Sequence, residues 1–218
     1  MRPRRMIALL MLCVGALSAC DTSNSRQEKT GEGRPTASST SIGGPFKLTD
    51  QKGKTVTERD LVGKPSLIFF GFTFCPEVCP TTLLHISKWL KDLGPTGGKI
   101  NTFYVTIDPQ RDTQKQLQLY LSSFDPRIRG LTGTSAQIAE IAKAYHVYYK
   151  RVNLKNGDYV MDHSTMIYMV DAAGRFAGPI GYVEPDDHVM PLLRDLISRR
   201  KPKFRQPDPS TSIERSEG

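Results

Sequence analysis

Cysteine is scarce in this chain of 218 residues, and its distribution limits the chemistry that the protein can perform. Of the four cysteines, Cys13 and Cys20 lie in the first twenty residues, so a domain further along the chain holds one thiol pair, Cys75 and Cys79. A structural zinc site takes four ligands, often from two cysteine pairs. Because there is no second pair, the sequence excludes a four-cysteine zinc site.

The chain also lacks a long apolar run in its first segment. The run 6–17 is shorter than the roughly 20 residues that a membrane-spanning helix needs. It follows a basic start and leads into Leu17-Ser18-Ala19-Cys20, which is the order of regions in a secretory signal. These last four residues resemble a bacterial lipoprotein signal. We therefore expect 1–20 to be a lipoprotein signal peptide and Cys20 to carry lipid.

Large apolar residues are almost absent from 21–43, which reads as a flexible tether, and the polar, proline-containing segment 201–218 reads as a disordered tail. The folded domain is then 44–200. We expect the protein to be exported and lipid-anchored to the cytoplasmic membrane, facing the periplasm or the cell exterior. The net charge of +8 falls to +5 without the three signal arginines, and nothing resembles a nucleic-acid-binding motif. No nucleic-acid partner is expected.

Within 44–200 the pattern predicts an α/β sandwich around a mixed central sheet flanked by helices, with an N-terminal β-hairpin. The hairpin is expected at 46–48 and 55–57. Further strands are expected at 66–72, 100–107, 164–170 and 175–182, and extended segments at 147–152 and 159–161. Helices are expected at 81–93, 113–124, 135–145 with Ser135 as N-cap, and 186–199, where Pro191 must start, kink or shorten the helix.

Cys75 and Cys79 follow directly after the apolar strand 66–72, where a strand gives way to a helix. A helix N-terminus favours the thiolate, which is both a nucleophile and a metal ligand. On one helical turn, their Cβ atoms would lie about 5–6 Å apart. That separation permits either a disulfide or a bound metal ion. Three residues between them, rather than two, is atypical of thioredoxin-like redox motifs, and two thiolates with one imidazole suit copper.

Three segments together resemble the Sco/SenC family, whose members help assemble the copper centre of cytochrome c oxidase. They are Gly71–Pro80 (GFTFCPEVCP), Val105–Thr113 (VTIDPQRDT) and Asp162–Asp171 (DHSTMIYMVD). The resemblance covers 44–198 and implies a thioredoxin-like fold. One departure is Phe74, where many members have histidine, and this change would make the rim of the site more apolar.

The resemblance places the family's copper ligands on Cys75, Cys79 and His163, which would hold Cu(I) or Cu(II). It also implies that Cys75 and Cys79 form a disulfide when oxidised. Asp108 follows a strand and could support the site or its redox chemistry, or simply begin a helix. Asp162 could orient His163 from outside the ligand sphere, or face water.

We expect a membrane-tethered protein that passes copper to the copper-receiving subunit of the oxidase, with no small-molecule substrate. The alternative is a thiol–disulfide oxidoreductase, in which Cys75 attacks and Cys79 resolves, acting on the oxidase copper site or another target outside the cytoplasm. Proline is missing around 164–166, where thioredoxin-type reductases usually carry a cis-proline, and this favours metal binding. The methionines at 161, 166 and 169 alternate along the chain, which favours packing in the core.

Overall fold

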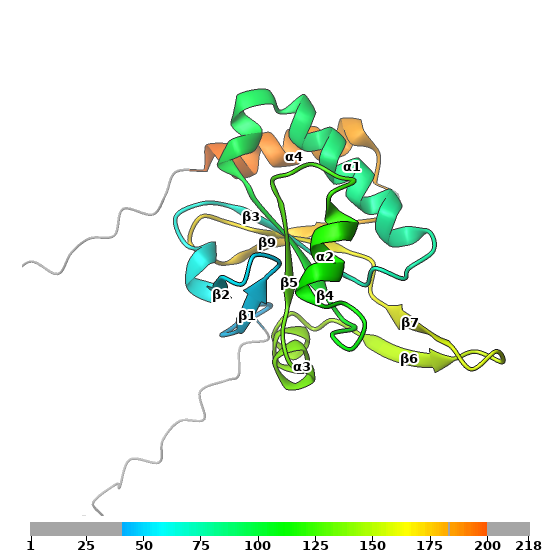
Figure 1. The fold of residues 1–218 in the computed structure, drawn as a ribbon. Helices are drawn as coiled ribbons and strands as arrows, with labels where there is room; N and C mark the ends of the chain where they lie inside the picture. Colours follow the sequence, from blue (N-terminus) through cyan, green and yellow to red (C-terminus); the bar gives the residue numbers. More distant parts are fainter. Residues whose placement is uncertain (1–40, 183, 200–218) are drawn as a thin grey trace, which may run out of the picture. The chain divides into compact units, whose positions relative to one another are not determined.

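The computed structural model describes residues 41–182 and 184–199, which form a mixed α/β sandwich (Figure 1). A seven-stranded sheet has the order β2-β1-β5-β4-β3-β8-β9. Its strands are β1 Lys47–Asp50, β2 Thr55–Thr57, β3 Ser66–Gly71, β4 Asn101–Thr106, β5 Ile128–Thr132, β8 Ile167–Val170 and β9 Phe176–Ile180. The predicted fold class and the N-terminal hairpin, formed by β1 and β2, are both confirmed.

The central strand β3 is buried along its whole length, which explains its unbroken apolar sequence. It pairs in parallel with β4 and antiparallel with β8, and β4 pairs in parallel with β5. Gly71, the last residue of β3, lies opposite Thr106, the last residue of β4. The loop that follows β3 therefore begins beside the loop that follows β4, and this sheet edge carries the two cysteines.

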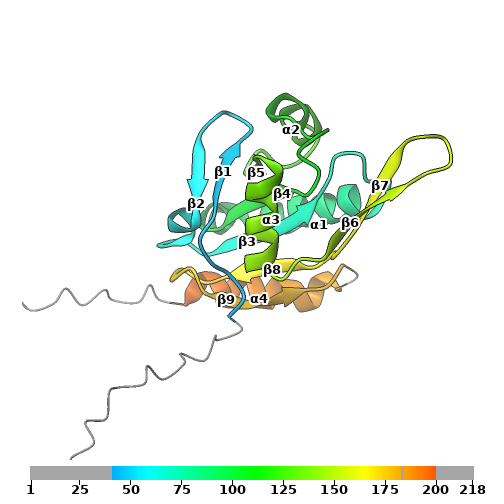
Figure 2. The same cartoon turned by 90° about the horizontal axis from the view of Figure 1, so that it is seen from below.

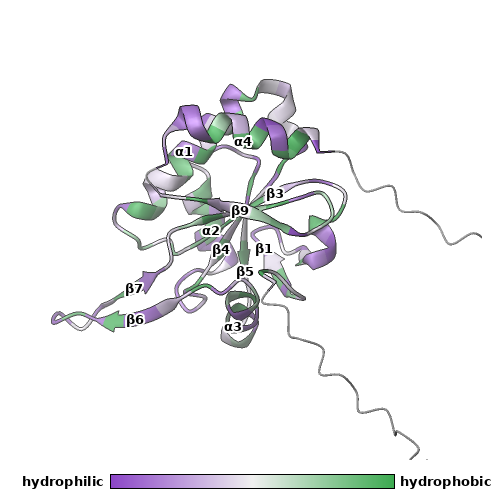
Figure 3. Ribbon diagram, turned by 180° about the vertical axis from the view of Figure 1, so that it is seen from behind, coloured by the Kyte–Doolittle hydropathy of each residue, from purple (hydrophilic) through white to green (hydrophobic). Residues whose placement is uncertain are grey.

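Helices cover both faces of the sheet. α1 (Val78–Asp92) and α4 (Asp186–Ser198) lie together on one face, while α3 (Ser135–Ala144) lies on the other (Figures 1 and 2). α2 (Gln114–Leu121) packs on β5, where Gly130 leaves room for Leu117 and Leu121. Figure 3 shows hydrophobic and hydrophilic residues alternating along α1 and α4, as expected for helices that bury one side.

A separate two-stranded hairpin extends from the same end of the domain as the cysteine loop. Its strands are β6 (Tyr149–Asn153) and β7 (Tyr159–His163), which lie side by side in Figure 2. They pair antiparallel, and Tyr149 lies opposite His163. The sequence predicted extended chain in both places but no pairing between them. His163 is therefore the last residue of β7 and precedes β8 by three residues, rather than beginning the strand predicted at 164–170.

Two local predictions are wrong, and one strand was missed. α1 begins at Val78 instead of residue 81, so Cys79 is in its first turn and Cys75 precedes it. The N-cap of α3 is Thr134, not Ser135, because Thr134 accepts the Gln137 amide in a reciprocal capping box. β5 was not predicted at all. Pro191 lies inside α4, so it neither starts nor ends the helix, and the alternative of a kink at Pro191 stays a prediction.

The expected signal peptide (1–20), most of the tether (21–43) and the tail (201–218) lie outside the described residues. The end of the expected tether does not: Ile42 packs against the core, and the Gly43 amide donates to the Ala144 carbonyl at 2.8 Å. In the described part of the chain, no helix is both long enough and apolar enough to cross a membrane.

Candidate metal centre

Three side chains from two distant segments converge at the end of β3. The Sγ atoms of Cys75 and Cys79 and a ring nitrogen of His163 all lie within 4.8 Å of one another. Cys79 is fully buried, whereas Cys75 and His163 are partly exposed. The two sulfurs and the imidazole therefore form one compact donor set, with one ligand sealed in the core and two reachable from solvent.

The cysteine loop is held by its own backbone. The Cys75 amide donates to the Phe72 carbonyl at 3.2 Å, and the Cys79 amide, in the first turn of α1, donates to the Cys75 sulfur at 3.3 Å. Cys75 thus occupies the place of an anion at a helix N-terminus, although it is not itself in the helix. Both thiols are free in this structure.

His163 is oriented so that one ring nitrogen faces the sulfurs. Its Nδ1 lies 2.7 Å from the Ser164 carbonyl oxygen, which can only accept, so Nδ1 carries the proton. Nε2 then presents a lone pair 3.7 Å from the Cys79 sulfur. The ring also packs edge-on against Phe72, with centroids 5.8 Å apart. These two contacts fix the tautomer and the ring plane that a metal ligand requires.

The two thiols differ sharply in acidity because they share one proton. Hydrogen bonding from the Cys79 thiol, opposed by burial and reinforced by His163, lowers the pKa of Cys75 to about 4. The same hydrogen bond and burial raise the pKa of Cys79 far above its usual range. Near neutral pH the pair is therefore a Cys75 thiolate that accepts a hydrogen bond from the Cys79 thiol.

A buried carboxylate anchors the cysteine loop to β4. Asp112 accepts hydrogen bonds from the Thr73 amide at 3.0 Å, the Thr73 hydroxyl at 2.6 Å and the Thr106 hydroxyl at 2.6 Å. It is fully buried, and burial raises its pKa. Since Thr73 lies two residues before Cys75, Asp112 fixes the position of the loop that carries the first sulfur.

Arg111 joins the cysteine loop to the hairpin that carries His163. Its guanidinium lies over the rings of Phe74 and Tyr159, at 4.6 Å and 3.7 Å from their centroids. Asp108 accepts from Arg111 Nε at 2.6 Å and from the Tyr159 hydroxyl at 2.9 Å. Asp108 therefore reaches the site through Arg111 and Tyr159, and its carboxylate bonds to neither the cysteines nor His163. Phe74, the residue that departs from the family pattern, gives this cation a ring to lie on.

The structure also places Asp162 and the three methionines at 161, 166 and 169. Asp162 is exposed and accepts a long hydrogen bond from the Tyr148 hydroxyl at 3.5 Å. The group that orients the His163 ring is the Ser164 carbonyl, and not Asp162. Met169 is buried as predicted and Met161 is half-buried, but Met166 is exposed, because it lies in the loop before β8 and not in a strand.

The remaining histidines lie outside this donor set. His85 sits near Asp186 at 3.8 Å and against Trp89, and His188 pairs with Glu184 at 2.5 Å. His146 follows α3 in a left-handed backbone conformation and is exposed. Of the histidines in the described ranges, His163 is the one whose ring joins two cysteine sulfurs.

Comparison with known proteins decides the family. The family model described as SCO1/SenC matches residues 34–198 of the chain. The chain belongs to the SCO1/SenC family. This SCO1/SenC chain is 36% identical over 207 residues to "Protein SCO2, mitochondrial" of Saccharomyces cerevisiae, a match that covers 93% of this chain and 69% of the relative. It is 37% identical over 174 residues to "SCO2-like protein RP587" of Rickettsia prowazekii, covering 78% of this chain and 85% of that one.

Solved structures agree with the SCO1/SenC assignment. The structure of Bradyrhizobium japonicum ScoI with copper bound is similar with a TM-score of 0.68 and 48% identity, covering 71% of this chain and 99% of that one. Yeast Sco1 with copper bound gives a TM-score of 0.69 at 36% identity, covering 80% and 96%. A structure of BsSco, described as a Sco-family cytochrome c oxidase assembly protein with a disulfide switch, gives 0.58 at 25%, covering 73% and 95%.

Two residues of this SCO1/SenC site were not singled out from the sequence. Asp112 and Arg111 both lie in the segment Val105–Thr113, but an Arg-Asp-Thr sequence before a helix reads as an ordinary helix start. The role of Asp112 became visible only in the structure, where its carboxylate accepts a hydrogen bond at 3.0 Å from the amide of Thr73, 39 positions away in the sequence.

Proposed function

We propose that this protein binds one copper ion between Cys75, Cys79 and His163 and delivers it to cytochrome c oxidase during assembly of the oxidase. The observation that carries the proposal is the donor set itself, two sulfurs and one imidazole nitrogen within 4.8 Å. Thiolate sulfur is the donor that Cu(I) prefers, and imidazole nitrogen suits copper in both oxidation states. The copper-bound relatives support the choice of metal.

The site suits a metal that must be released as well as bound. Cys75 and His163 border a hollow of about 280 Å³, whose other lining includes Pro76, Val78 and Met161. A receiving protein could approach Cys75 and His163 through this hollow, while Cys79 stays buried. Replacing the two exposed ligands before the buried one gives a stepwise route for transfer.

A second candidate function is thiol–disulfide exchange, and the opposite pKa shifts of the two cysteines favour it. The Cys75 thiolate would attack a target disulfide, forming a mixed disulfide and releasing one target thiolate. Cys79 would then lose its proton to solvent and attack the Cys75 sulfur, releasing the second target thiolate. Two electrons pass to the target, and the Cys75–Cys79 disulfide remains.

Copper titration of the domain from Gly44 tests the main proposal. The reduced protein should bind one copper per chain, and Cu(II) should give a sulfur-to-copper charge-transfer absorption. Cys75 is already a thiolate near neutral pH, so the cysteine pair should release about one proton per copper, from Cys79. The same protein with the pair oxidised is the matched control and should bind no copper tightly. Equal binding by the two forms would contradict the proposal.

We further propose that lipid on Cys20 tethers the protein to the membrane, which would raise its effective concentration near a membrane-bound target. Cys20→Ser should shift the protein from the membrane fraction to the soluble fraction, or leave it unprocessed. Cys13→Ser is the control and should leave the fractionation unchanged, because Cys13 would be removed with the signal. Intact membrane retention and mature mass in Cys20→Ser would rule out the lipid anchor.

A further inference from the structure

One buried polar group close to the site has no partner. The side chain of Tyr104, in the central strand β4, is fully buried, and its hydroxyl makes no hydrogen bond within the part of the chain described. Buried tyrosine hydroxyls are usually hydrogen-bonded, because an unpaired one loses its water without compensation. An orphaned hydroxyl in the core is therefore a feature that needs an explanation.

Gly71 shows where this hydroxyl points. A Cβ atom added to Gly71 would lie 2.7 Å from the Cys79 sulfur and 2.9 Å from the Tyr104 hydroxyl oxygen. The Cys79 sulfur and the Tyr104 hydroxyl oxygen therefore both lie next to the Cα atom of Gly71, on the same side of β3. Any side chain at position 71 would occupy that space, so the glycine keeps the approach between them open.

We infer that the Tyr104 hydroxyl is a built-in hydrogen-bond donor to the Cys79 sulfur when that sulfur is a copper ligand. A cysteine that ligates copper is a thiolate, and a thiolate is a strong hydrogen-bond acceptor. Water cannot solvate this sulfur, because Cys79 is fully buried. The donor must therefore come from the protein.

This inference rests on the proposed function and adds a consequence to it. A hydrogen bond to a ligating sulfur withdraws electron density from the sulfur and favours the reduced metal, as in other copper–thiolate sites whose potentials depend on such bonds. Tyr104 would therefore bias the site toward Cu(I). It would also raise the energy of the sulfur-to-copper charge-transfer band, because the sulfur electrons are held more tightly.

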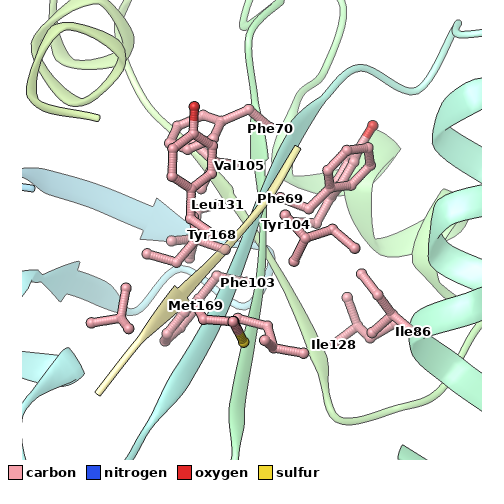
Figure 4. Close-up of a cluster of buried hydrophobic side chains, with 14 of the residues drawn as sticks. Phe69, Phe70, Ile86, Phe103, Tyr104, Val105, Ile128, Leu131, Tyr168 and Met169 are labelled. Atoms are coloured by element: carbon pink, nitrogen blue, oxygen red, sulfur yellow. The ribbon is translucent and has the colours of Figure 1, made fainter. Parts of the chain in front are cut away.

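Tyr104→Phe removes the hydroxyl and leaves the ring, and the chain offers a matched control in Tyr168→Phe. Tyr168 is also buried, and its hydroxyl is likewise without a hydrogen-bond partner in the described segment. Figure 4 shows the two tyrosines on opposite sides of the central strands, and Tyr168 packs on Phe70 and Tyr145. The two substitutions thus delete the same buried group at different distances from the sulfur.

Tyr104→Phe should still bind one copper per chain. Its Cu(II) charge-transfer band should move to lower energy, and its ratio of Cu(I) to Cu(II) affinity should fall roughly tenfold, the effect of losing one hydrogen bond to a charged acceptor. Tyr168→Phe should match the wild type in both. In the wild type itself, the NMR signal of the Tyr104 hydroxyl proton should move downfield when Cu(I) binds, because the proton enters a hydrogen bond to a thiolate.

The outcomes separate this inference from the proposed function. A wild type that binds no copper would overturn both. A wild type that binds copper while Tyr104→Phe shares its band energy and affinity ratio would overturn the role of Tyr104 alone. If Tyr104→Phe does not fold, the NMR signal of the hydroxyl proton in the wild type decides, and a signal that stays in place when Cu(I) binds would be enough to reject the donor.

Discussion

Cys79→Ala should lose tight copper binding, with an affinity more than about 100-fold below that of the wild type. Loss of a residue that merely supports a metal ligand already costs about 10–100-fold, and Cys79 is a direct donor in the proposed set. Cys75→Ala should have an equally large effect, because the domain has no other cysteine to replace it. Competition against a Cu(I) chelator of known affinity measures both losses.

Thr82→Ala is a matched control for these variants. Thr82 is buried in α1 one turn after Cys79, and its hydroxyl donates to the Val78 carbonyl at 2.8 Å. Its loss removes a buried polar side chain without removing a copper donor. Thermal unfolding should show that all three variants fold, and Thr82→Ala should keep full copper affinity. Wild-type affinity in Cys79→Ala would place the copper elsewhere in the molecule.

The sequence predicted most of the fold because its strongest patterns are local. β3 is a continuous apolar run, and the helices on either side of the sheet carry one apolar face each. The strand that it missed, β5, shows the limit of this reasoning. Its sequence Ile-Arg-Gly-Leu-Thr contains a charge and a glycine. In the structure, Arg129 donates a hydrogen bond to the Asp50 carboxylate at 2.9 Å, and Gly130 leaves room for the side chains of α2.

The candidate ligands could be predicted because Cys75, Cys79 and His163 lie in recognisable motifs, but their supports could not. Asp112 accepts a hydrogen bond from Thr73, which lies 39 positions away in the sequence. The Tyr104 hydroxyl and the Cys79 sulfur, from residues 25 positions apart, both lie beside Gly71. Neither contact leaves a periodic signal, since each depends on two strands ending at the same sheet edge. The prediction for Asp162 has the same weakness, because adjacency in sequence to His163 did not determine which group its ring contacts.

The position of His163 on the hairpin sets this candidate ligand apart from the two cysteines. His163 ends β7, outside the seven-stranded sheet, and Arg111 connects this hairpin to the cysteine loop through Tyr159 and Phe74. The cysteines are held separately, by the start of α1 and by Asp112 acting on Thr73. We therefore expect substitutions of His163 to act on the chemistry of the site more than on its fold.

His163→Ala should separate copper delivery from thiol exchange, which cysteine variants cannot do because both functions need both cysteines. The largest cause of the low pKa of Cys75 is the Cys79 thiol, with His163 contributing less. The variant should therefore keep a reactive Cys75 thiolate, which should still attack a small-molecule disulfide and reduce it to the dithiol. It should hold Cu(I) weakly through two sulfurs, lose the Cu(II) absorption, and fail to support assembly of cytochrome c oxidase in cells.

Copper supplied in excess should partly restore assembly in His163→Ala cells, since mass action offsets weaker binding. His188→Ala is the matched control, because that imidazole pairs with Glu184 away from the sulfurs and its loss should change neither activity. The decisive condition is copper limitation. If His163→Ala cells assemble the oxidase normally there, an imidazole ligand is not needed, and thiol exchange by Cys75 and Cys79 becomes the function that the site performs.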